Sequence, residues 1–104
     1  MKNFLKRLFR PKTDLTRMVN DGALIIDVRT KNEFDSGHIH GSKNIPLDAI
    51  NKAAGKLKDL NRPIITVCRS GARSGMAKSI LSATGIEVYN GGAWTILNKQ
   101  LERR

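Results

Sequence analysis

The sequence has only one cysteine, Cys68, and no long apolar run. With a single thiol among 104 residues, no disulfide can form within the chain, and nothing points to an oxidising compartment, so we expect a cytoplasmic protein. The longest apolar runs have the length of strands, which excludes a membrane-spanning helix. There is no internal repeat or heptad pattern, and the length fits one domain with one hydrophobic core.

Acidic and aromatic residues are also scarce. Nine aspartates and glutamates stand against 19 lysines and arginines, which gives a net charge of +10, and aromatic side chains make up 5% of the chain. The basic residues are scattered and are not interleaved with aromatic ones, which argues against a nucleic-acid partner. The consequence that we expect is a positive potential that attracts small anions.

The first ten residues lack the continuous apolar stretch of a signal peptide, so we expect no export signal. They mix basic residues with four large apolar ones on one predicted helical face: Phe4, Leu5, Leu8 and Phe9. Such a face suits contact with a membrane surface or a partner, or packing on the domain. We favour a short packed helix or a frayed chain end, because the segment is short and Pro11 ends it. The chain therefore divides into a basic amphipathic segment, residues 1–12, and a domain, residues 13–104.

Predicted helices and strands alternate along this domain. Helices are predicted at 14–20, 48–54 (ended by Gly55), 74–84 (ended by Gly85) and 93–101, a helical turn at 30–34, and strands at 23–28, 43–45, 63–67 and 87–89. Such alternation predicts an α/β fold, with a mostly parallel sheet of four to five strands and helices on both faces. Parallel sheets bind ligands at the carboxyl ends of their strands, so we expect Asp27, Arg29, Cys68 and Asn90 to gather at one edge.

Cys68 is the strongest functional candidate because it ends an apolar run, whereas a structural cysteine would lie inside one. Polar and basic residues 69–73 follow it, and then helix-forming sequence. A thiol that faces the amino end of a helix is stabilised as its thiolate. Gly71 lets the loop curl its N–H groups around one point, and small Ser70 and Ala72 leave room. The sequence thus predicts an anion-binding cup with a nucleophilic sulfur at its base.

Three motifs lie in order around this cysteine. The loop from Cys68 to Arg73 reads Cys-x-x-x-x-Arg. Before it come Leu24-Ile25-Ile26-Asp27-Val28-Arg29, Glu33-Phe34, Gly37-His38-Ile39, Gly41-Ser42 and Asn44-Ile45-Pro46, and after it Gly91-Gly92-Ala93-Trp94. Together they resemble the active-site loop and the two terminal signatures of the rhodanese family of sulfurtransferases. The combination is specific, although each motif alone recurs by chance.

The resemblance implies a rhodanese-like fold and a thiosulfate sulfurtransferase. A Cys68 thiolate would take the sulfane sulfur of an anionic donor, either thiosulfate or another persulfide, hold it as a persulfide of its own, and pass it to a thiol or cyanide. Cys68 is the expected catalytic residue, and the expected substrate-binding residues are Arg69, Ser70, Gly71, Ala72, Arg73 and Ser74. The resemblance gives Asp27 and Arg29 a supporting role, with a surface salt bridge as the alternative for this pair.

We expect neither a cofactor nor a metal ion. His38 and His40 stand two residues apart on a predicted loop without a third ligand nearby, which is poor geometry for zinc. His38 matches the family's Gly-His-Ile, where it packs the loop. Trp94 is predicted to anchor the core.

Two other functions stay open. A cysteine-dependent phosphatase or arsenate reductase of the same fold also needs a thiolate in an N–H cup, but phosphatase relatives use Cys-x5-Arg, and here that arginine position is Ser74. A non-catalytic rhodanese-like sulfur-carrier or regulatory module is the third reading, and such modules typically lack the cysteine that this chain has. The sequence carries no signal for an oligomeric state.

Overall fold

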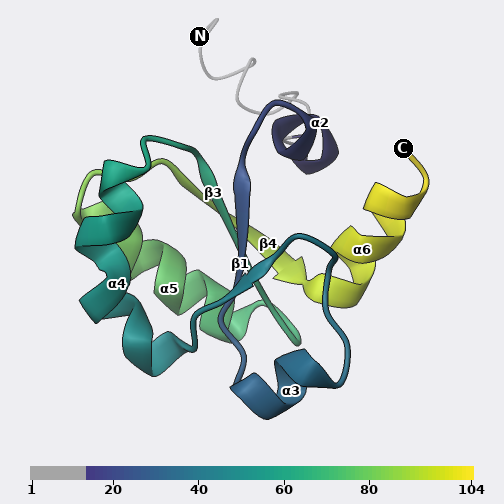
Figure 1. The fold of residues 1–104 in the computed structure, drawn as a ribbon, viewed down its shortest axis with the longest axis horizontal. Coiled ribbons are helices and arrows are strands. Elements are labelled where there is room, and N and C mark those ends of the chain that lie inside the picture. Colours follow the sequence, from purple (N-terminus) through teal and green to yellow (C-terminus); the bar gives the residue numbers. More distant parts are fainter. Residues whose placement is uncertain (1–13) are drawn as a thin grey trace, which may run out of the picture.

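The computed structural model describes residues 14–104, which form helices and strands in alternation (Figure 1). The predicted amphipathic segment, residues 1–12, lies outside the described residues. The elements in chain order are α2 (Leu15–Asn20), β1 (Leu24–Asp27), α3 (Lys31–Asp35), β2 (Lys43–Asn44), α4 (Leu47–Asp59), β3 (Ile64–Cys68), α5 (Ala72–Ala83), β4 (Val88–Ala93) and α6 (Trp94–Glu102).

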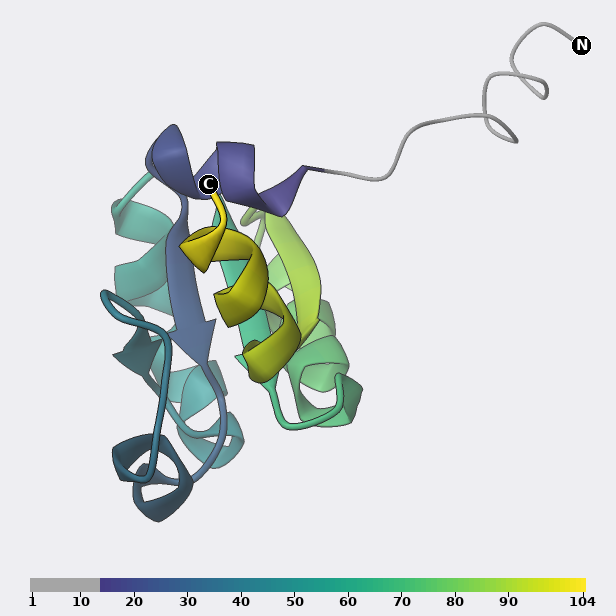
Figure 2. The same ribbon diagram turned by 90° about the vertical axis from the view of Figure 1, so that its right-hand side faces the viewer.

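The strands form one four-stranded sheet in the order β2-β1-β3-β4, and every neighbouring pair is parallel. This confirms the predicted α/β fold. The central strand β3 is buried along its whole length, which explains its continuous apolar sequence, since parallel strands are covered on both faces. The carboxyl end of β1 points toward the end of the molecule that carries α3 (Figure 2).

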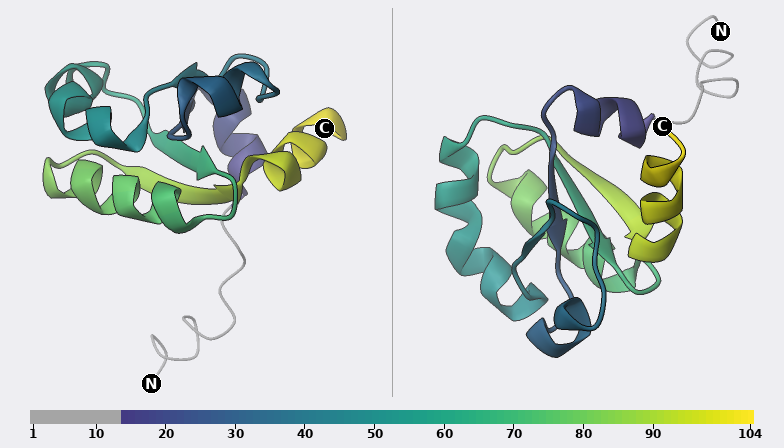
Figure 3. Two further views of the ribbon diagram at one scale, coloured as in Figure 1. Left: turned by 90° about the horizontal axis from the view of Figure 1, so that it is seen from below. Right: turned by 45° about the vertical axis from the view of Figure 1, so that its right-hand side comes forward.

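Helices cover both faces of the sheet, as predicted (Figures 1 and 3). Successive residues of a strand point to opposite faces. Ile64 accordingly packs with Ile50 of α4 and Leu81 of α5, whereas its neighbour Ile65 packs with Leu97 of α6 and with α2. Cys68 belongs to the cluster on the α4 and α5 face.

The predicted end of α4 at Gly55 is wrong, because the helix continues to Asp59. A glycine inside a helix costs about 1 kcal/mol relative to alanine. Burial of Leu57, which is 3% exposed and joins the core cluster, offsets this cost. Gly85 does end α5, where its φ of 91° suits glycine.

Two boundaries near Cys68 also differ from prediction. Helix α5 begins at Ala72 instead of residue 74, so the last residues of the predicted loop form the first helical turn. Strand β4 runs to Ala93 instead of ending at residue 89. The register between β3 and β4 shifts between Thr66 and Val67, and Ala93 pairs with Cys68. The amino end of α6 therefore begins next to the carboxyl end of β3.

Within residues 14–104, none of the helices has the length and apolar character that spanning a membrane requires.

Candidate active site

Cys68 is the last residue of β3, and its side chain is 1% exposed. Residues 68–74, here called the Cys68 loop, lead from this strand into the first turn of α5. Gly71 precedes the helix and has a φ of 104°, a conformation that side chains other than glycine's rarely adopt. The predicted need for a glycine at this turn is confirmed.

The loop closes around the sulfur. The Gly71 N–H donates a hydrogen bond to Cys68 Sγ at 3.0 Å, and Ser74 Oγ lies 3.3 Å from the same sulfur. No side chain caps the amino end of α5, so its first N–H groups stay available to the loop interior. A curled loop with the sulfur at its base is thus present, and the Gly71 N–H and the Ser74 hydroxyl are among the groups that contact the sulfur.

The pKa of the Cys68 thiol is lowered from its usual value of 9.0. Burial acts in the opposite direction and raises the pKa, since the interior disfavours a charge. Hydrogen bonds from the Ser74 hydroxyl and from the backbone N–H groups of Ser74, Ser70 and Gly71 together outweigh burial. The loop therefore makes the thiolate, which is the nucleophilic form, easier to form than in an ordinary cysteine.

Arg73 and Arg69 differ in what they contact. The guanidinium of Arg73 donates to the Glu33 carboxylate, from Nη1 to Oε1 at 2.7 Å and from Nη2 to Oε2 at 3.0 Å. Arg69 is exposed and, among residues 14–104, makes no hydrogen bond or ion pair. It borders an open depression of about 590 Å³, together with Ser36, Trp94 and others. Arg69 is thus the cation of the loop that remains available to a ligand.

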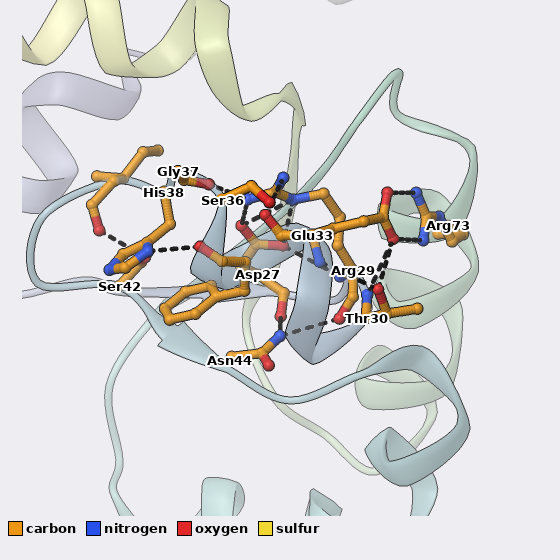
Figure 4. A network of polar contacts seen from close by, with 12 residues as sticks. Asp27, Arg29, Thr30, Glu33, Ser36, Gly37, His38, Ser42, Asn44 and Arg73 are labelled. Carbon is orange, nitrogen blue, oxygen red and sulfur yellow. Dashed lines mark hydrogen bonds and ion pairs between the residues drawn. The ribbon is translucent and has the colours of Figure 1, made fainter.

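Asp27 and Arg29 form a buried ion pair, so the surface salt bridge considered for them is wrong (Figure 4). Their exposed fractions are 0% and 5%. Arg29 donates to both carboxylate oxygens of Asp27, and it also donates to the carbonyl oxygens of Glu33 at 3.1 Å and Gly37 at 2.7 Å. The pair therefore fixes α3 and the loop after it, which is a supporting position.

Glu33 connects this buried pair to the Cys68 loop. Its carbonyl accepts from Arg29 while its carboxylate binds Arg73, and it also completes a capping box with Thr30 at the start of α3. Glu33 belongs to the motif that resembles the family signature, but no pattern in the sequence indicates its partner Arg73, which lies 40 residues away.

Asn90 is a further residue of the site to which the sequence assigned no contact. Its Oδ1 accepts a hydrogen bond from Ser74 Oγ at 2.6 Å, and its Nδ2 donates to the Gly71 carbonyl at 3.1 Å. Both contacts are to the Cys68 loop. The position of Asn90 at the predicted end of a strand, before two glycines, was the only available signal.

His38 and Trp94 have packing positions. The His38 ring stacks on Phe34 at 3.7 Å, and its Nδ1 lies 2.7 Å from the Phe34 carbonyl oxygen. Trp94 packs against the core cluster on the α6 face, and the Arg29 guanidinium lies 4.7 Å from its ring centre. In residues 14–104, no group of three or more histidine, cysteine, aspartate or glutamate side chains could hold a metal ion.

The fold and this loop agree with a family match. The Rhodanese-like domain model matches residues 11–95, and the chain belongs to this family. The predicted resemblance is thereby confirmed.

Known relatives share part of the sequence. The uncharacterized protein YqhL of Bacillus subtilis is 39% identical over 69 residues, which are 65% of this chain and 54% of that protein. The thiosulfate sulfurtransferase PspE of Escherichia coli is 38% identical over 69 residues, which are 64% of this chain and 66% of PspE. The chain thus spans about half of YqhL. Among solved structures, a rhodanese with anions from E. coli is 34% identical, with a TM-score of 0.65, and covers 71% of this chain and 89% of that one.

Proposed function

We propose that this protein is a sulfurtransferase that carries a sulfane sulfur as a persulfide on Cys68. The observation that carries the proposal is the contact between the buried sulfur and its cup, with Gly71 N at 3.0 Å and Ser74 Oγ at 3.3 Å. Donors fixed around one sulfur stabilise negative charge there without a general base. A relative named thiosulfate sulfurtransferase supports the same chemistry.

The reaction takes two displacements. The Cys68 thiolate attacks the outer sulfur of thiosulfate, a Cys–S–S bond forms, and the S–S bond to the sulfite group breaks, so that sulfite leaves with the electron pair. An acceptor thiolate or cyanide then attacks the outer sulfur of the persulfide. The bond to Cys68 breaks, and the thiolate is regenerated. A free catalytic thiol is compatible with a reducing compartment, and the proposal includes a cytoplasmic location.

The proposal assigns first contact with the anionic donor to Arg69, which is exposed and beside the depression. A planar guanidinium can pair with two oxygens of a sulfonate-like group. Arg73 supports the loop through Glu33, and it would reach the donor only by leaving that carboxylate. Arginine at this position therefore does not form the free phosphate clamp that a phosphatase would need.

Thiosulfate-to-cyanide turnover of the wild type and of Cys68→Ser tests the proposal. Turnover is expected in the wild type and should vanish in Cys68→Ser, whose circular dichroism should stay unchanged. Turnover that persists in the folded Cys68→Ser protein, or that is absent from the wild type, would refute it.

A further inference from the structure

Cys68, Ser74 and Asn90 form a line of hydrogen bonds from the sulfur to the exposed edge of β4. Ser74 Oγ lies 3.3 Å from Cys68 Sγ and 2.6 Å from Asn90 Oδ1. Ser74 is completely buried, and its carbonyl accepts a hydrogen bond from Thr66 Oγ1 at 2.9 Å. The hydroxyl thus has a fixed position between two partners.

The orientation of the Asn90 amide is set by two other contacts. Gly92 N–H donates to Oδ1 at 2.9 Å, and Nδ2 donates to the Gly71 carbonyl oxygen at 3.1 Å. If the amide were turned over, an N–H would face the Gly92 N–H, and two oxygens would face each other at Gly71. The atom that Asn90 presents to Ser74 is therefore an oxygen, which can only accept.

The direction of the remaining hydrogen bonds follows. A serine hydroxyl carries one proton, and at 2.6 Å from an acceptor oxygen that proton points to Asn90. Ser74 cannot donate to the sulfur at the same time, so the 3.3 Å contact requires a Cys68 S–H that donates to Ser74 Oγ. This arrangement is the one for a neutral thiol.

We propose that Asn90 is a positioning residue that competes with the Cys68 thiolate for the single proton of the Ser74 hydroxyl. When the thiol loses its proton to solvent, the Ser74 hydroxyl turns from Asn90 to the sulfur. Gly92 N–H then remains on Asn90 Oδ1. When Cys68 ionises, the Ser74 hydroxyl therefore becomes a hydrogen-bond donor to the sulfur, and the hydrogen bond from Ser74 to Asn90 Oδ1 is lost. The proposal rests on the function proposed for the thiolate, but it concerns the thiol itself.

The charged groups around Cys68 lie outside this line. Asp27 at the end of β1 is bound by Arg29, Arg73 of α5 is bound by Glu33, and Arg69 is exposed. In the described part of the chain, none of these side chains hydrogen-bonds to Ser74 or Asn90. Substitution of Ser74 or Asn90 therefore leaves every one of these charges in place.

The test is the acid dissociation constant of Cys68, followed by thiolate absorbance and by the rate of iodoacetamide alkylation against pH. Cys68 is the only thiol in the chain, so both signals report on it alone. Ser74→Ala should lower the dissociation constant about tenfold, because the charged thiolate loses a hydrogen-bond donor.

Asn90→Ala frees the Ser74 proton, which should favour the thiolate, but it also removes the hydrogen bond to the Gly71 carbonyl, which loosens the loop. These two effects on the dissociation constant oppose each other. The double variant separates them.

In each background, the effect of Asn90→Ala is the ratio of the Cys68 acid dissociation constants measured with and without that substitution. This ratio should be about three- to tenfold larger in the wild-type background than in the Ser74→Ala background. An equal factor in both backgrounds would show that Asn90 acts only by holding the loop, and would overturn the proposal. So would a Ser74→Ala variant with an unchanged dissociation constant. Both readouts are independent of sulfur transfer, so failure of the proposed function would leave them unaffected.

Infrared spectroscopy tests the resting arrangement on the unaltered protein, in case Asn90→Ala does not fold. Below the thiol pKa, the S–H stretch should have the lowered frequency of a donor, and Ser74→Ala should raise it toward that of a free thiol. A free-thiol frequency in the wild type would contradict the assigned hydrogen-bond direction.

Discussion

Arg73 and Glu33 are joined by a two-pronged ion pair that ties the Cys68 loop to α3, with nitrogen to oxygen distances of 2.7 and 3.0 Å. The two side chains are 33% and 30% exposed, so the pair is partly shielded from water. The same residue, Glu33, is held by the buried Arg29 through its carbonyl. The loop around the thiol therefore connects through one glutamate to the buried ion pair at the end of β1.

This pair predicts a pH dependence of stability. The hydrogen bond from Arg73, followed by the one from the Thr30 backbone, lowers the pKa of Glu33 from 4.5 to about 2. Because the folded pKa is the lower one, the pair stabilises the fold above about pH 4.5, and this contribution disappears as the pH falls toward 2. Urea unfolding should show Glu33→Gln less stable than the wild type at pH 6, with the difference shrinking on acidification. In an Arg73→Ala background, most of this pH dependence should be absent. The same dependence in both backgrounds would contradict the assignment to Arg73.

Arg69 should govern the affinity for an anionic donor. Arg69→Ala is expected to raise the KM for thiosulfate about tenfold with little change in kcat, because a charge-assisted contact to the donor is lost. Arg62→Ala is the matched control, since it removes one positive charge at the opposite end of β3, where Arg62 contacts the Gly22 carbonyl. Equal KM changes in both variants would point to the overall field instead of a local contact.

Any side chain at position 91 should lower the stability of the fold, because Gly91 is closely surrounded by other atoms. A Cβ at this position would lie 2.8 Å from Ile65 Cγ2, 2.9 Å from Val67 Cγ1 and 3.0 Å from the Thr66 carbonyl oxygen. Gly91→Ala should therefore destabilise the protein by about 1–3 kcal/mol in urea unfolding. Gly55→Ala is the control, because no atom lies within 4 Å of that Cβ, and in α4 it should stabilise by about 0.5–1 kcal/mol. A Gly91→Ala variant as stable as the wild type would contradict this packing.

The sequence predicted the parallel sheet, the cup and the place of Cys68 because these follow from local patterns. An apolar run, a glycine and a helix-forming segment lie next to one another in the chain. The end of α4 was missed because a local glycine signal was outweighed by burial of Leu57, which only the tertiary structure provides. The burial of the Asp27–Arg29 ion pair also depends on the tertiary structure, so local sequence patterns did not predict it.

The contacts of the loop were missed for a related reason. Arg73 meets Glu33 across 40 residues, and Asn90 meets Ser74 across 16. No periodicity or spacing encodes such pairs, since they depend on how α3 and β4 approach the carboxyl end of β3. The sequence placed Arg73 among the expected substrate-binding residues and did not indicate that its terminal nitrogens face Glu33.

The amino-terminal segment is predicted to be dispensable for the chemistry. Deletion of residues 1–10 should leave turnover with small donors nearly unchanged, because the family match begins at residue 11. If the segment is a surface anchor, the full chain should sediment with anionic vesicles at low salt and the truncated chain should not, since basic residues near such a surface contribute about 1 kcal/mol each. Equal sedimentation would exclude the anchor, and loss of turnover would show that the segment supports the site.

The mass of the intact protein after incubation with thiosulfate tests the persulfide most directly. The account predicts a gain of one sulfur atom in the wild type, its removal by a thiol reductant or cyanide, and no gain in Cys68→Ser. An unchanged wild-type mass, or an added sulfur that also appears on Cys68→Ser, would contradict it.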